Sequence, residues 1–124
     1  MENKQEIFNK IKKVLKKYNK YFTETLDTDG SYSLVSIKEI EILGRKRSDI
    51  AFASLIIQKN YVAFYYMPVY AFPNKASELV PEELLKFKNG KSCFTITKIN
   101  RALLKQIDVA LQQGRDLYED MNWV

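Results

Sequence analysis

The chain contains no histidine and a single cysteine, Cys93. Within one chain, these absences exclude the usual zinc sites built from His and Cys, the Ser-His-Asp triad and a Cys-His pair. Acid–base chemistry would fall to Asp, Glu, Lys or Tyr, and a metal site would use oxygen ligands, which favour hard ions. Because no nucleophile–base pair or metal constellation is legible, we expect a protein that is not an enzyme and needs no cofactor.

Glycine and proline are also scarce, with four and three residues among 124. Together with 46% hydrophobic and 28% charged residues, this composition is typical of a folded chain, and the length predicts a single domain over residues 1–124. No apolar run reaches the roughly 18 residues that cross a bilayer, and the first ten residues lack the apolar region of a signal peptide. We therefore expect a cytoplasmic protein without membrane contact.

The net charge of +5 is confined to one segment. Residues 1–22 hold seven Lys and two Glu, whereas residues 23–124 balance thirteen basic against thirteen acidic side chains. In "KQEIFNKIKKVLKKYNKYF" the apolar residues recur at steps of three and four, which predicts an amphipathic helix with a basic outer face. A solvated face on a helix that packs against a sheet is the favoured interpretation; contact with nucleic acid or with an anionic membrane is the less favoured one.

The middle of the chain changes to a period of two. "TETLDTDGSY" reads as a connector, and "SLVSIKEIEIL" predicts a strand with a bulge at Lys38-Glu39, where the phase slips. Gly44 opens a turn through "GRKRSD". "IAFASLII" and "YVAFYYMPVY" predict a hairpin that turns at Lys59-Asn60.

The last third of the chain predicts helices around one further strand. Pro81 begins the short helix "PEELLKF", which Gly90 terminates, and "SCFTIT" is a strand. The final helix begins near Asn100, and Gly114 inside it indicates close packing or a break. We predict an α+β fold: a two-layer α-β-α sandwich with an antiparallel sheet of four to five strands and the N- and C-terminal helices packed on one face.

The stretch "YVAFYYMPVY", residues 61–70, is apolar on both faces of a strand. Val62, Phe64 and Tyr66 alternate with Ala63 and Tyr65, so only one of these faces can belong to the helix core. The second face needs another cover, which is the 71–90 segment, a partner subunit or a ligand. Cys93, flanked by strand-like residues, is interpreted as a buried structural thiol.

A cluster of basic residues follows the first strands in "GRKR". It is either a solvated turn or a site for anion capture; "NGKS" does not complete a phosphate loop, because Leu85 stands where the earlier glycine is needed. The hypothesis is a non-enzymatic domain whose cleft, between the sheet and the 71–90 segment, binds a small anionic ligand or a protein partner. The candidate ligand-binding residues are Arg45, Lys46, Arg47, Tyr66, Tyr70 and Lys91.

Three stretches together resemble the YdhG-like family of small bacterial domains: "GRKRSDIAFASLIIQKNYVAFYYMPVY", "GKSCFTI" and a closing helix with "GRDLYE". The resemblance covers about residues 32–119 and implies an α-β-α domain with an antiparallel sheet. Some members are described as frataxin-like iron chaperones for iron–sulfur cluster or haem assembly, which implies iron as a cargo. The carboxylates that would hold it are Glu39, Glu41, Asp116, Glu119 and Asp120. A homodimer that joins through the exposed sheet face is a further alternative.

Overall fold

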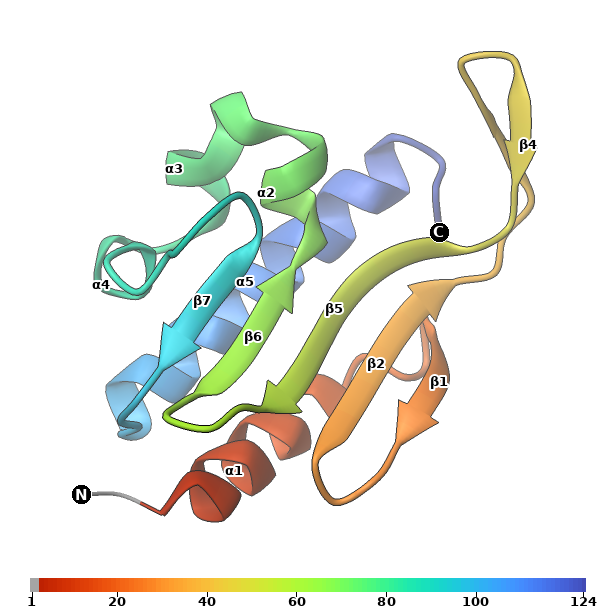
Figure 1. Cartoon of the computed structure of the whole chain (residues 1–124). Coiled ribbons are helices and arrows are strands. Elements are labelled where there is room, and N and C mark those ends of the chain that lie inside the picture. The colour runs from red at the N-terminus through yellow and green to blue at the C-terminus, as the bar shows by residue number, and fades with distance from the viewer. Residues whose placement is uncertain (1–2) are drawn as a thin grey trace.

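The computed structural model describes residues 3–124. Its elements are α1 (Lys4–Lys16), β1 (Thr23–Asp27), β2 (Ser31–Ser36), β3 (Ile40–Ile42), β4 (Arg45–Arg47), β5 (Ile50–Ile57), β6 (Val62–Tyr66), α2 (Met67–Ala71), the 3₁₀ helix η1 (Pro73–Lys75), α3 (Ala76–Leu79), α4 (Glu82–Leu85), β7 (Cys93–Ile96) and α5 (Arg101–Asp120). Five strands form an antiparallel sheet in the order β1-β2-β5-β6-β7, and β3 and β4 form a separate two-stranded ribbon (Figure 1). The predicted α+β class is confirmed.

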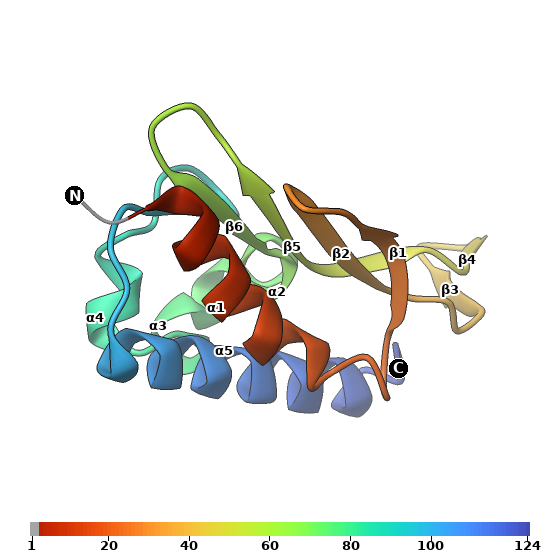
Figure 2. The same cartoon turned by 90° about the horizontal axis from the view of Figure 1, so that it is seen from below.

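The helices cover one face of the sheet only. Figure 2 shows α1 and α5 beneath the sheet, and the short helices α2, α3 and α4 contact α5 in the same layer. The 71–90 segment therefore extends the helix layer and does not cover the second sheet face. That face, which we call the open face, is turned toward the viewer in Figure 1, and no helix of the described chain crosses it.

The two terminal helices begin at asparagine caps. The Asn3 side chain accepts a hydrogen bond from the Gln5 N–H at 2.7 Å, and Asn100 accepts one from the Leu103 N–H at 2.8 Å. The first helix ends at Lys16, earlier than the predicted end near residue 22. The chain continues in tight turns, in which the Tyr18 N–H bonds to the Leu15 carbonyl, so Tyr18 and Phe22 are still buried as the periodicity predicts.

The region before β5 differs from the prediction in three ways. The expected connector contains the edge strand β1, which pairs with β2 although all five of its residues are exposed. The phase slip at Lys38-Glu39 marks the end of one strand and the start of another, and the irregular register lies between Leu34 and Val35 instead. The turn occupies Leu43 and Gly44, whereas Arg45–Arg47 form β4.

The stretch "VAFYYMPVY" is half strand and half helix. The strand β6 ends at Tyr66, and Met67–Ala71 form α2 because Pro68 stands in the first helical turn, where its missing N–H costs no hydrogen bond. The 71–90 segment also holds more helix than predicted, since α3 precedes α4, and α4 ends at Leu85, five residues before Gly90. The predicted strand at "SCFTIT" and the β5–β6 hairpin are confirmed.

Aromatic rings form the centre of the core. Val62, Phe64 and Tyr66 are fully buried on the helix side of β6, as their alternation predicts. Phe22 stacks on Phe52 with ring centroids 4.0 Å apart, and Phe52 meets Tyr118 edge-on at 5.4 Å. These contacts join the turns that follow α1 to β5 and α5 in a single core, and the short helix α2 packs against β5 and α5.

Candidate functional site

The β3–β4 hairpin projects from the sheet as an arm (Figure 1). Its turn has positive φ at both central residues, 52° at Leu43 and 80° at Gly44, as a type I′ turn requires. The register pairs Ile42 with Arg45, so these two side chains share one face of the ribbon; Ile40 and Arg47 form the next pair on that face. Ile40 is buried, which shows that this face is turned toward the body of the protein.

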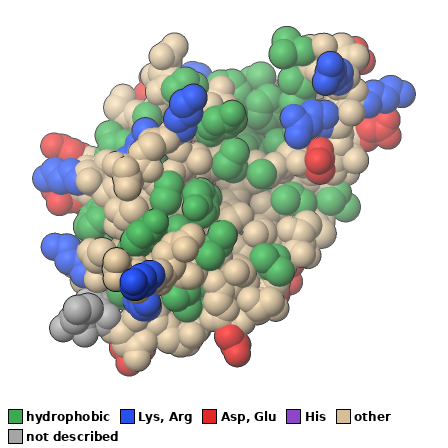
Figure 3. Space-filling model, in the orientation of Figure 1, with side chains coloured by type: hydrophobic (Ala, Val, Ile, Leu, Met, Phe, Trp, Pro, Cys, Tyr) green, Lys and Arg blue, Asp and Glu red, His purple; other side chains and the backbone are tan. Residues whose placement is uncertain are grey.

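Two adjoining cavities lie between this arm and α2, and we call them together the hairpin groove. Ile42, Tyr70 and Ala71 line both. The inner cavity, about 250 Å³, also involves Met67 and Trp123, and the outer cavity is about 700 Å³. Figure 3 shows hydrophobic side chains gathered in the hollow beside the arm. The outer volume falls within the range typical of small-molecule sites.

The charges in the hairpin groove are of one sign at its outer end. Lys88 and Lys91 line the outer cavity, and no carboxylate lines it. The Lys88 ammonium donates to the Gly90 carbonyl at 2.6 Å, which leaves further donors for a ligand, and Lys91 is an exposed residue of the same lining. At the inner end, Arg47 is only 3.5 Å from the Asp49 carboxylate, so its charge is partly neutralised.

A fixed aromatic wall closes the inner cavity. The Trp123 ring stacks on Phe72 at 5.3 Å and meets Tyr118 edge-on at 5.1 Å. The backbone N–H of Trp123 donates to the Tyr118 carbonyl at 2.7 Å, and the backbone carbonyl of Trp123 accepts from the Ser36 hydroxyl. Trp123 is the only tryptophan of the chain, so its fluorescence reports on this cavity alone.

The structure brings three of the six predicted ligand residues into the hairpin groove: Arg47, Tyr70 and Lys91. Tyr70 is 55% exposed and stands between the two cavities. Arg45 shares the body-facing side of the ribbon but lines neither cavity. Lys46 points to the opposite side with Glu41, and its ammonium lies 3.7 Å from Glu39.

The prediction for Tyr66 is wrong. This side chain is fully buried, and its hydroxyl donates to the Ala110 carbonyl of α5. Burial raises the pKa of the phenol well above its ordinary value, so the neutral form is held in the core. Tyr66 is in phase with Val62 and Phe64, and that phase was the sequence signal for a core position.

Sequence reasoning missed several residues of the groove. Met67, Lys88 and Trp123 were not candidates, because they are distant in sequence from "GRKR" and only the fold brings them to it. The signal that was available is the Met67-Pro68 pair, since proline in a first helical turn predicts α2 and hence a wall opposite the arm.

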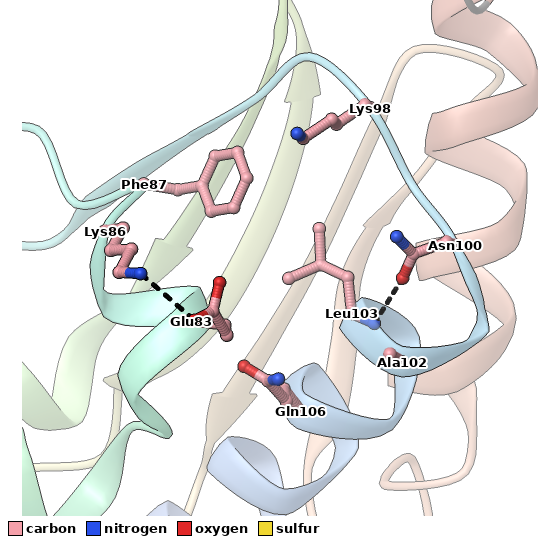
Figure 4. A pocket seen from close by; sticks show the side chains of 8 residues that line it. All are labelled: Glu83, Lys86, Phe87, Lys98, Asn100, Ala102, Leu103 and Gln106. Atoms are coloured by element: carbon pink, nitrogen blue, oxygen red, sulfur yellow. Dashed lines mark hydrogen bonds and ion pairs between the residues drawn. The ribbon is translucent and has the colours of Figure 1, made fainter.

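A third cavity, about 270 Å³, lies between α4 and the start of α5 (Figure 4). Four of its polar side chains, those of Glu83, Lys86, Asn100 and Gln106, have partners within the protein. The Lys86 ammonium lies 3.0 Å from the Glu83 carboxylate, Asn100 caps α5, and the Gln106 side-chain oxygen accepts from the Leu84 N–H at 2.9 Å. The Gln106–Leu84 hydrogen bond joins α4 to α5, and the other two contacts hold the ends of these helices, so this cavity is better described as a structural contact between helices than as a ligand site.

The carboxylates proposed for iron lie on two separate elements, the arm and α5. Glu39 is paired with Lys46, while Asp116 and Glu119 both pair with the Arg115 guanidinium, at 3.1 and 2.8 Å. Among residues 3–124, no group of three or more His, Cys, Asp or Glu side chains is arranged to hold a metal ion. The iron assignment stays a prediction.

The basic helix α1 is neutralised in part by its own neighbours. Lys12 and Lys16 both pair with Asp27 of β1, and hydrogen bonds from the two ammonium groups lower the pKa of the Asp27 carboxyl. Lys17 pairs with Asp108 at 2.8 Å. The Lys4 ammonium also donates to the Gln58 carbonyl at 3.0 Å, so at least four of the seven lysines contact other parts of the protein, which favours the solvated-helix interpretation.

Cys93 lies on the open face and is half-buried, and burial raises the pKa of its thiol.

In the part of the chain that the structure covers, no helix combines the length and the apolar character needed to cross a bilayer. Comparison with protein-family models, curated proteins and solved structures yields no match. The geometry of this chain alone therefore carries the functional argument.

Proposed function

We propose that this chain is a non-enzymatic binding domain that holds a small anionic ligand with an apolar body in the hairpin groove. The observation that supports it is the outer cavity, whose walls are mostly apolar and whose only charged side chains are Lys88 and Lys91. An apolar body would replace water along Val69, Pro73 and Ala76, while an anionic head would meet the two ammonium groups.

The position of Tyr70 supports the same ligand chemistry. Its half-exposed ring separates the two cavities, so a ligand that fills the outer cavity would stack on one side of it, and its hydroxyl can donate to an anion. Arg47 is held by Asp49 at the inner end and would contribute less. The charge that matters in this proposal is therefore that of the two lysines, and less that of "GRKR".

The experiment uses 8-anilinonaphthalene-1-sulfonate, which joins apolar rings to one sulfonate, and follows energy transfer from Trp123. The test variant is K88Q/K91Q, and the matched control is K10Q/K13Q, which removes the same charge from exposed lysines of α1. Two partly exposed charge contacts of about 0.7 kcal/mol each correspond to roughly tenfold weaker binding for the test variant. The control should bind as the wild type does.

Displacement by a simple carboxylate then distinguishes binding at this site from nonspecific adsorption of the dye to apolar surface. Decanoate should displace the dye, and the uncharged decanol should do so far less well, because it has no anionic head for the lysines. Equal affinity of the wild type and K88Q/K91Q, or equal displacement by decanoate and decanol, would refute the proposed site.

A further inference from the structure

We propose that two copies of this chain associate weakly and symmetrically through the open face. This surface borders the hairpin groove and shares only Ala51 with it, and the inference does not rest on the proposed ligand. The open face comprises the side chains of the five-stranded sheet that alternate with the buried ones. Its middle row follows the register across the whole sheet: Leu26, Ser33, Ser54, Tyr65 and Cys93.

The two flanking rows have the same chemistry as the middle row. On one side the register aligns Ser31, Ile56, Ala63 and Thr95, of which Ala63 is already fully covered by its neighbours. On the other side it aligns Thr23, Val35 and Ala51. None of the side chains in the three rows is charged, although the chain carries 28% charged residues and a net charge of +5. Figure 3 shows this centre without the charged side chains that surround it.

The absence of charged side chains on the open face favours a second copy of this chain as its binding partner. An acidic or basic partner would gain no electrostatic complementarity from a neutral face, whereas a neutral face is matched in polarity by itself. Two copies with +5 each repel one another, and they do so least where a neutral face meets a neutral face. The Ser33 and Ser54 hydroxyls form a hydrogen bond with each other at 3.0 Å, so a partner can cover the centre of the face without leaving either oxygen atom without a hydrogen bond.

The middle row is also complementary to itself in size. The small Ser33 and Ser54 lie side by side at its centre, and the large Leu26 and Tyr65 lie on either side of them. A two-fold axis that runs along β5 through Ser54 would place each Tyr65 ring over the partner's Ser33. Leu26, which is 43% exposed at the β1 edge, would then be covered by the partner's β7 side of the sheet.

The size of the face sets the strength of the association. Five strands about 4.8 Å apart and about 15 Å of strand length give a face of roughly 300 Å² per copy. Two copies would bury about 600 to 800 Å² in total, which is at the weak end for specific interfaces. We therefore expect a dissociation constant on the order of 100 μM, with a monomer at low micromolar concentration.

Sedimentation of the full chain from 5 to 500 μM tests the inference. The average mass should rise from 14.5 kDa toward twice that value, and the rise should be larger at 0.5 M salt than at 0.1 M, because salt screens the repulsion between copies. Ser54→Lys should stay monomeric, because it places two ammonium groups together at the seam. Gln113→Lys, which adds the same charge to the exposed side of α5, should associate at least tenfold more strongly than Ser54→Lys.

Cys93 supplies a second measurement that needs no substitution. Its alkylation rate should fall by half or more between 5 and 500 μM protein, because the partner covers it. A wild-type mass of 14.5 kDa throughout, or equal association of the Ser54→Lys and Gln113→Lys variants, would overturn the inference. An alkylation rate that stays constant while the mass doubles would place the contact on another surface and would overturn it as well.

Discussion

Replacement of Gly114 by alanine should destabilise the protein, although alanine is the better helix former. A Cβ atom at this position of α5 would lie 2.5 Å from the Tyr66 hydroxyl oxygen and 2.8 Å from Cγ of Pro68. Neither neighbour can yield easily, because the Tyr66 hydroxyl is buried and bonded to the Ala110 carbonyl, and Pro68 is fixed in α2. The glycine therefore allows α2, which carries Tyr70 of the hairpin groove, to approach α5.

The magnitude follows from three contributions. Alanine would gain about 1 kcal/mol of helix propensity over glycine. Overpacking costs about 1 to 3 kcal/mol, and a weakened buried hydrogen bond of Tyr66 costs about 1 kcal/mol more. The net loss in the free energy of unfolding is about 1 to 3 kcal/mol, or a fall in Tm of roughly 4 to 12 °C, which urea and thermal unfolding by circular dichroism would measure.

A double-mutant cycle with Tyr66→Phe provides the control. Phenylalanine removes the oxygen atom that the new Cβ would meet, so the cost of Gly114→Ala should fall by about 1 kcal/mol in the Tyr66→Phe background. A Gly114→Ala variant that is as stable as the wild type, or more stable, would refute the close approach of α2 to α5.

Three further perturbations have outcomes that the structure determines. Leu43→Asn should raise the free energy of unfolding by about 0.5 to 1 kcal/mol in urea titrations, because Leu43 has φ of 52° and is 98% exposed, so asparagine relieves the backbone and removes no packing; a loss of stability would mean that its side chain packs in the free protein. Asn100→Ala should cost about 1 kcal/mol, since it removes the acceptor for the Leu103 N–H, whereas Asn100→Asp should retain most of the stability; equal stability of the two variants would contradict the cap. Burial raises the pKa of Tyr66 and Tyr118, so their contribution is intact below pH 10 and is lost above it by about 1.4 kcal/mol per pH unit for each residue; burial raises the pKa of Tyr18 and Tyr32 as well, so urea unfolding at pH 9 and pH 11 should differ by at least about 2 to 3 kcal/mol, and an unchanged midpoint would contradict the burial of these phenols.

The elements that could be predicted from the sequence are those whose apolar residues lie on one face of the helix or strand. The alternation of Val62, Phe64 and Tyr66 places β6 correctly, and the helical spacing from Ile7 to Phe22 predicts the buried stripe even though α1 ends at Lys16. The strand β1 could not be predicted in this way, because all of its residues are exposed and it is held by pairing with β2. Apolar and polar residues alternate along a strand only where one of its faces is buried, and no residue of β1 is buried.

The candidate site was predictable only in part, for a related reason. Tyr70 and Lys91 were foreseen as exposed aromatic and basic residues near a loop, and both line the hairpin groove. Trp123 and Lys88 belong to it because α5 and the 71–90 segment fold back toward the arm, a tertiary contact that no local spacing encodes. Tyr66 was predicted to be a ligand residue because of its hydroxyl. Its alternation with Val62 and Phe64 was the stronger signal, and it correctly predicts a position in the core.

Binding in the hairpin groove can be located directly by titrating ¹⁵N-labelled protein with decanoate and following the amide and indole chemical shifts. The largest changes should fall on α2, the Leu43 turn, Lys88, Lys91 and the Trp123 indole N–H, and they should saturate together with one dissociation constant. Changes confined to α1 or to the open face, or no changes at millimolar decanoate, would contradict the hairpin groove as the binding site.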